Sequence, residues 1–161
     1  MRRLLKFIFV SFIVFGYAIP ILAQDRYDEN ETSVNLFRNP SIGIENRVDQ
    51  ISMHIGFYPT VISKNKEGKN ESTSFIKVGM SFWYLPWGDK LIPSSLFFTF
   101  SFVHGLSKSY KGRNGFIVET GSRVMLDDHF NFRLGIALLK AKEHPWKLNP
   151  TPGLSYSFME K

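Results

Sequence analysis

Apolar and polar residues alternate with a period of two along most of this chain, and residues 114–142 show the pattern most clearly. In the second half of that stretch one face collects large apolar side chains: Phe130, Phe132, Leu134, Ile136 and Leu138. Residues at the intervening positions are polar, charged or small. Alternation of this length predicts β-structure with two unlike faces. Asp127 and Asp128, between two such runs, predict a tight turn.

The alternation continues from residue 32 to the end of the chain, without a convincing helical period, linker or repeat. It predicts eight strands, at residues 32–38, 41–48, 50–62, 73–84, 95–107, 115–126, 129–142 and 153–159. The first strand has the weakest pattern of the eight.

The two faces of the predicted sheet differ sharply in composition. One face contains no charged residue and consists largely of Ile, Val, Leu, Met and Phe, including Phe98, Phe100 and Phe102. The other face contains charged residues together with Gly and Ser, which leave room inside a narrow barrel. A lysine or arginine facing lipid at mid-depth would cost about 2–4 kcal/mol, so the absence of charge favours a lipid-facing side. We therefore predict an all-β fold: an eight-stranded antiparallel up-and-down transmembrane β-barrel with a filled polar lumen.

The connections between the predicted strands also fall into two kinds, which alternate along the chain. Those at residues 64–72, 108–114 and 143–150 are polar and charged, whereas those at 49, 85–93 and 127–128 are shorter or less basic. This asymmetry is typical of a barrel with exposed outer loops and short periplasmic turns. Aromatic residues with polar groups near strand ends are candidates for interfacial girdles: Tyr58, Trp83, Tyr84, Trp87, Tyr110 and Trp146.

Residues 1–23 have a basic start, an apolar core and a small residue, Ala23, before Gln24, as a cleaved secretory signal has. An uncleaved membrane anchor is the alternative. Residues 24–31 are polar and predict a flexible lead-in, which leaves 32–161 for the barrel. Removing residues 1–23 lowers Lys+Arg from 20 to 17 against 14 acidic residues, so the mature net charge is +3. That excess does not predict nucleic-acid binding, and the absence of cysteine excludes disulfides and thiolate metal sites.

The signal ending in Ala-Gln, the segment NPSIGIENRVDQISMHIGFYP (39–59) and the terminal GLSYSF (153–158) resemble small outer-membrane β-barrel proteins of Bacteroidota. More broadly, residues 32–159 resemble the eight-stranded domains typified by outer membrane proteins A and X. The assembly signal of that family usually ends on an aromatic residue, whereas three residues follow Phe158 here. Many members have no assigned activity, so the resemblance implies the outer membrane as location and no particular chemistry.

Charged residues on the polar face are the first candidate site, because buried charges need partners. They are expected to form a lumenal network: Glu45, Arg47, Lys77, Glu119, Arg123 and Arg133. With four cations and two anions, His54 and Asn131 or water must contribute. A plug without a transport role and a narrow gate both fit these residues.

Two further sites lie near the predicted outer rim. His104 and Ser107, with Ser109 and His144 nearby, are weak candidates for lipid A modification, but no orienting acid accompanies them. Basic residues of the outer loops are candidates for binding lipopolysaccharide phosphates: Lys64, Lys66, Lys69, Lys108, Lys111, Arg113, Lys142 and Lys147. No metal, nucleotide or other cofactor motif occurs.

The sequence thus favours a monomeric outer-membrane barrel with a structural or surface-interaction role, which contacts membrane lipid and lipopolysaccharide. A lipid A-modifying outer-membrane enzyme and a soluble, lipocalin-like periplasmic binding barrel remain alternatives. The soluble alternative requires the phenylalanine-rich face to point inward.

Overall fold

The computed structural model describes residues 30–37, 42–64, 70–88 and 92–160. Within these ranges the side chains of residues 37, 61–64, 70–71, 109 and 159–160 are outside the description. The predicted signal peptide (1–23) and most of the predicted lead-in (24–29) also lie outside it. No helix in the described part of the chain is long and apolar enough to span a membrane.

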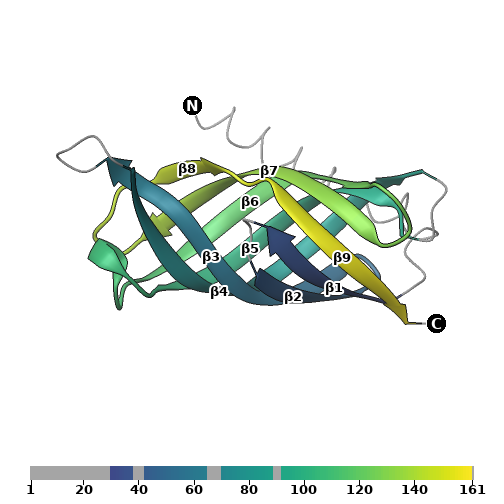
Figure 1. Ribbon diagram of the computed structural model, residues 1–161, viewed down its shortest axis with the longest axis horizontal. Helices are drawn as coiled ribbons and strands as arrows, with labels where there is room; N and C mark the ends of the chain where they lie inside the picture. Colours follow the sequence, from purple (N-terminus) through teal and green to yellow (C-terminus); the bar gives the residue numbers. More distant parts are fainter. Residues whose placement is uncertain (1–29, 38–41, 65–69, 89–91, 161) are drawn as a thin grey trace, which may run out of the picture.

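The described chain is an antiparallel barrel whose strands follow one another in sequence order (Figure 1). The strands are β1 (Asn30–Phe37), β2 (Ile42–Val48), β3 (Ile51–Lys64), β4 (Asn70–Trp87), β5 (Ser94–Gly105), β6 (Asn114–Met125), β7 (Phe130–Ala141), β8 (Lys147–Pro150) and β9 (Gly153–Glu160). A short 3₁₀ turn, η2 (Lys108–Tyr110), connects β5 to β6. Pairing of β1 with β9 closes the barrel, which confirms the predicted eight-stranded closed architecture once β8 and β9 are counted together.

β8 and β9 form one barrel strand with a break in the middle. Both pair with β7 in the same register, Ala137 with Asn149 and Asn131 with Ser155. The Thr151 N–H donates to the Gly135 carbonyl at 2.8 Å across the break. The sequence placed residues 143–150 in a loop, and this is wrong for β8: the eighth strand begins at Lys147. Pro150 and Pro152, which cannot donate to a ladder, obscure the strand pattern there.

The strands are tilted around the barrel axis. Pairing followed from Glu31 through β2 to β7 arrives at Asn149, but Glu31 itself pairs with Met159, ten residues beyond Asn149. Such a stagger is the shear that a closed barrel requires. It also means that the side chains of several strands meet at each level of the interior.

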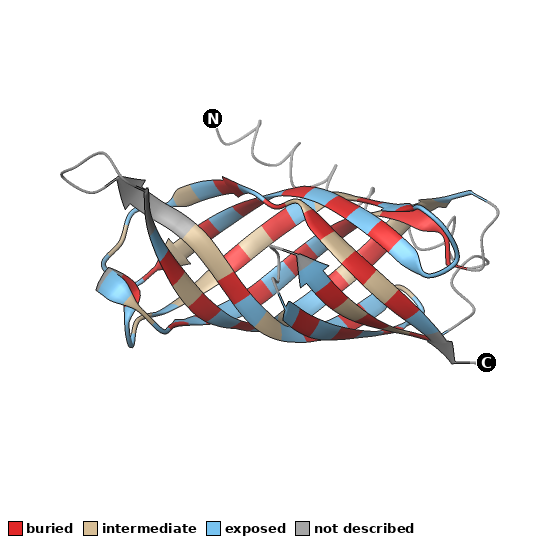
Figure 2. Ribbon diagram, viewed as in Figure 1, coloured by how far each residue is buried: buried red, intermediate tan, exposed pale blue. Residues whose placement is uncertain are grey.

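Side chains alternate inward and outward along every strand, and burial alternates with them (Figure 2). The outward positions are exposed and apolar; examples are Ile42, Ile44, Met53, Ile55, Ile76, Val78, Met80, Phe98, Phe100, Phe102, Leu134, Ile136 and Phe158. The inward positions include the buried Arg123, which is 0% exposed, and Arg133, which is 8% exposed. The phenylalanine-rich face therefore lies outside, opposite to what the soluble binding barrel requires.

The barrel has two distinct ends. At the turn end lie the short β2–β3 and β6–β7 connections and the end of β9; at the loop end lie η2 and the β7–β8 connection (Figure 1). Asp49 takes a left-handed conformation (φ 53°) in the β2–β3 turn, which Asp tolerates better than most residues. The predicted turn at Asp127 is confirmed: its side chain accepts the backbone N–H groups of His129 and Phe130, each at 2.7 Å.

Candidate functional site

The interior nearest the turn end is organised by Glu31. Its carboxylate accepts hydrogen bonds from Arg47 Nε (2.9 Å), from Arg123 Nη1 (2.7 and 3.0 Å) and from the Ser157 hydroxyl (2.5 Å). Glu31 is 2% exposed. A single carboxylate thus neutralises cations from two strands far apart in sequence, which joins β1 to β2 and β6.

Two more ion pairs lie closer to the loop end of the barrel. Arg133 Nη1 donates to Glu45 Oε2 at 2.6 Å, and Glu45 also accepts the Ser52 hydroxyl. Lys77 Nζ lies 3.2 Å from Glu119 Oε2. All four ionic side chains are at most 9% exposed. Removing one member of a buried ion pair leaves the other charge in a poorly solvated site without a partner. These contacts therefore stabilise the barrel interior.

Trp83 fills the space between the two arginines of β6 and β7. Its ring lies 4.4 Å from the Arg123 guanidinium carbon and 4.8 Å from that of Arg133. The indole N–H donates to Ser52 Oγ at 2.9 Å. Arg123 Nε and Arg133 Nε and Nη2 are buried without a partner among the described residues. The face of the indole is a favourable neighbour for such weakly hydrated guanidinium groups.

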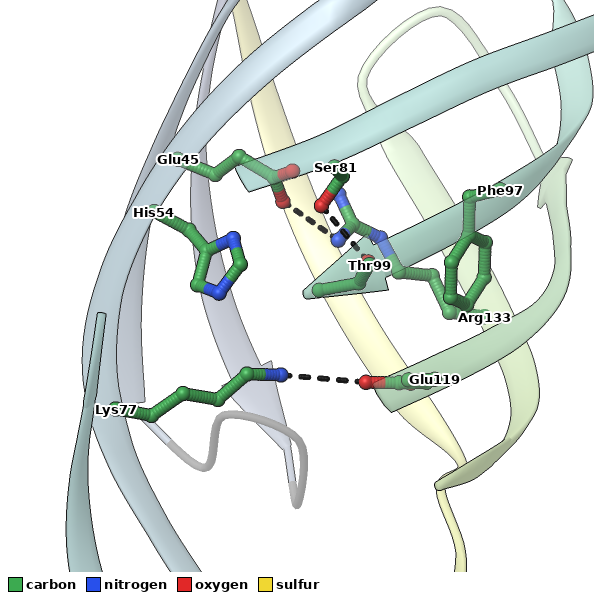
Figure 3. Close-up of a pocket in the computed structure, with 8 residues that line it drawn as sticks. All are labelled: Glu45, His54, Lys77, Ser81, Phe97, Thr99, Glu119 and Arg133. Carbon is green, nitrogen blue, oxygen red and sulfur yellow. Dashed lines mark hydrogen bonds and ion pairs between the residues drawn. The ribbon is translucent and has the colours of Figure 1, made fainter. Parts of the chain in front are cut away.

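A small void lies between the Arg133–Glu45 and Lys77–Glu119 ion pairs (Figure 3). Its volume is about 10 Å³, close to the minimum for one water molecule. It is lined by Glu45, His54, Lys77, Ser81, Phe97, Thr99, Glu119 and Arg133. The described side chains around this void therefore leave it room for about one water molecule.

His54, which lines the void, also makes the serine–histidine contact that most resembles a catalytic pair. His54 Nε2 lies 3.0 Å from Ser101 Oγ, and both residues are buried. Glu45 is nearby, but its carboxylate is engaged by Arg133 and Ser52. Nucleophilic catalysis also needs space for a substrate at the nucleophile. The neighbouring void holds only about 10 Å³, and Ser101 is not among the residues that line it.

Nearer the loop end the interior becomes apolar, so the predicted polar lumen holds only for the part nearer the turn end. Its buried members are Tyr58, Phe75, Val103, Tyr110, Ile117, Ala137, Leu139 and Ala141. Tyr110, from η2, stacks on His144 at 3.8 Å and meets the Phe75 ring edge-on at 5.3 Å. Burial raises the pKa of the Tyr110 phenol. The β5–β6 connection thus inserts an aromatic ring into the loop end of the barrel.

This inner packing also overturns half of the predicted aromatic girdles. Tyr58, Trp83 and Tyr110 point inward and are buried. Trp87 and Trp146 are exposed, at 40% and 54%, and Tyr84 stacks with the outward Phe82. Alternation should have separated Trp83 from Tyr84, because adjacent strand residues face opposite sides.

The rim histidine and serine do not form a catalytic arrangement in the described structure. His104 Nδ1 lies 2.7 Å from Asn114 Oδ1 on the outer surface. Ser107 Oγ is within hydrogen-bond distance of Thr73 and Ser74 instead. His144 stacks on Tyr110, and the side chain of Ser109 lies outside the description. No group of three metal-ligating side chains occurs within the described ranges.

The basic rim is only partly described. Lys66 and Lys69, and the side chain of Lys64, lie outside the description, whereas Lys108, Lys111 and Lys142 are exposed at the loop end. Arg113 pairs with Glu143 at 2.8 Å on the surface. Among the described residues, the exposed charged side chains at the turn end are acidic: Asp49, Asp127 and Asp128.

The six charged residues predicted for the lumen all lie inside and buried. Glu31 was missed, since the sequence assigned it to a flexible lead-in, whereas β1 begins at Asn30. It brings the described interior carboxylates to three against four cations. The signal was present: Glu31, Ser33 and Asn35 continue the polar face of the strand by period two.

No protein-family model, curated protein or solved structure matches this chain.

Proposed function

We propose that this chain is an outer-membrane β-barrel protein of a Gram-negative cell, with a sealed lumen and a structural or surface-interaction role. The observation that carries the proposal is the arrangement of the two faces: Phe100 is 55% exposed, and the ionic residues of β2, β4, β6 and β7 are enclosed. An apolar surface around a whole barrel far exceeds the patches that soluble monomers expose. In hydrocarbon the same surface is stable, because closure leaves no unpaired strand edge.

The band of apolar residues has the borders expected of a membrane protein. Among outward side chains described on the strands, Lys140 is the only charged one, and it lies near the end of β7. Trp146 and Trp87 are exposed toward opposite ends of the barrel. Aromatic residues of this kind favour the interface between hydrocarbon and water.

Charge asymmetry supports one orientation. Among the described residues, exposed charge is mainly basic at the loop end and acidic at the turn end, so the loop end fits the leaflet that carries phosphorylated lipopolysaccharide. Exposed lysines such as Lys108 and Lys111 are point charges suited to bridging phosphates. With this orientation the short turns lie in the periplasm, as is usual for such barrels.

The test uses the full chain expressed in a Gram-negative host. We expect it in the outer-membrane fraction, floating with vesicles, and migrating faster on a detergent gel when unheated than when boiled. A protein recovered from the soluble periplasmic fraction, with no change in migration on heating, would refute the proposal.

A further inference from the structure

We propose a binding site for the phosphate of a lipid on the outer wall of the barrel at its loop end. It comprises His104, Asn114, Lys140, Lys142 and Trp146, hereafter the headgroup ledge. This inference rests on the proposed function, because its ligand is a lipid of the surrounding leaflet. It is narrower than the general basic rim: His104, Asn114 and Lys140 lie at the loop-end termini of β5, β6 and β7, and Lys142 and Trp146 lie in the β7–β8 connection beside them.

The ledge residues are neighbours on adjacent strands. His104 on β5 pairs with Asn114 on β6, and the Lys142 N–H donates to the Asn114 carbonyl at 3.0 Å. Lys140 pairs with Phe116, one step closer to the apolar band. Neighbouring strands lie about 4.8 Å apart, so the ends of β5, β6 and β7 that carry the ledge span roughly 10 Å of the wall.

Two contacts fix Lys140 at this border. Its ammonium donates to the His144 carbonyl at 2.7 Å and lies 5.8 Å from the Trp146 ring. Trp146 in turn meets Phe116 edge-on at 5.6 Å. One of the three ammonium donors is thereby used, and the lysine is held beside the wall. Ordering before binding lowers the entropic cost of holding a phosphate.

Charge at the ledge has no balancing carboxylate in the described structure. Lys140 and Lys142 form no ion pair there, whereas the nearby Glu143 is paired with Arg113. Asn114 adds an amide donor, and its contact with His104 Nδ1 at 2.7 Å positions both side chains. A phosphate oxyanion would complement these groups through charge-assisted hydrogen bonds.

The surface directly below the ledge is suited to acyl chains. Phe116 stacks with Phe100 at 6.1 Å, and Leu138 and Leu148 are 37% and 66% exposed. A ligand with phosphate at the ledge and chains along this surface is an amphiphile whose headgroup carries a phosphate. A lipid satisfies both the charged border and the apolar wall. We assign the ledge to the phosphorylated glycolipid of the outer leaflet, because the proposed orientation places the loop end in that leaflet.

The test counts bound lipid by native mass spectrometry of the full chain in micelles containing bisphosphorylated lipid A. We expect retained lipid, and a loss of about tenfold or more in the Lys140→Gln/Lys142→Gln double variant, since two lysines near the anionic headgroup are removed. The Lys108→Gln/Lys111→Gln variant removes equal charge from the loop above and should lose less. Lipid A stripped of its phosphates should not be retained.

If the two double variants lost equal amounts of bound lipid A, the result would overturn the ledge and favour a non-specific basic rim. Displacement of lipid A by excess inorganic phosphate would also overturn it, because the ligand would then be free phosphate. Every variant is first checked for flotation and heat-modifiable migration. If the wild-type chain fails those checks, the proposed function is refuted. If the Lys140→Gln/Lys142→Gln variant folds, floats and retains as much lipid A as the wild type, only the ledge is refuted.

Discussion

At the scale of single residues, the buried Arg133–Glu45 pair holds two opposite walls of the barrel together. Replacing Arg133 with Met removes the cation that lies 2.6 Å from Glu45 and leaves that carboxylate buried. We expect the free energy of unfolding to fall by about 3–5 kcal/mol. Urea unfolding in lipid vesicles, followed by tryptophan fluorescence, measures it.

The matched control is Arg113→Met, which breaks the exposed Arg113–Glu143 pair. Surface pairs contribute about 0–1 kcal/mol, so this variant should unfold at nearly the wild-type urea concentration. If both variants lost the same free energy of unfolding, burial would not determine how much each ion pair contributes to stability.

Gly121 is a second residue whose identity the packing dictates. A Cβ at this position would lie 2.3 Å from the Leu134 carbonyl oxygen and 2.5 Å from the Gly135 Cα, both backbone atoms of β7. Neither can move without disturbing the β6–β7 ladder. We expect Gly121→Ala to lower the fraction that becomes heat-modifiable during refolding.

Ser122→Ala is the control for that experiment, since Ser122 is the neighbouring residue on the opposite, outward face. It should refold like the wild type. A normal yield for Gly121→Ala would mean that the two strands can separate at little cost.

At the scale of the element, each strand has one exposed, largely apolar side and one side that faces the interior, and β5 shows the division most clearly. Its outward residues Phe98, Phe100 and Phe102 lie at the middle of the wall. We expect Phe100→Arg to reduce the free energy of folding into vesicles by about 2–4 kcal/mol. In a water-exposed wall the same change would have little effect, so the result also bears on the proposed location.

Leu126→Arg provides the comparison, because Leu126 is equally exposed but lies in the β6–β7 turn. Arginine near the interface costs about 0–1 kcal/mol. We therefore expect the loss of folding free energy to be larger for Phe100→Arg, at the middle of the wall, than for Leu126→Arg, at its end.

At the scale of the whole molecule, the described side chains fill much of the barrel interior. The ion-paired half contains a void of about 10 Å³, and the apolar half is filled by residues such as Phe75 and Ile117, each 0% exposed. We expect the protein in planar lipid bilayers to show no discrete conductance steps. Reproducible steps from folded protein would contradict the sealed lumen.

Several features of the molecule could be predicted from local pattern. The turn at Asp127, the positions of most strands and the side on which Phe100 and Arg123 lie all follow from period-two alternation, because neighbouring strand residues face opposite ways. The pattern was weak where a strand is short or contains proline, so Glu31 in β1 and Asn149 in β8 were assigned to non-strand segments.

The sequence by itself determined which residues share a face, since that depends only on the geometry of the extended chain. Only the tertiary structure decided which charges meet: Glu31 and Arg123 are 92 residues apart and contact each other at 2.7 Å because closure and strand tilt bring them to one level. It also decided that the interior changes from ion pairs to apolar packing along its length. Partners across a barrel depend on stagger and closure, and no local period along the chain records either of them.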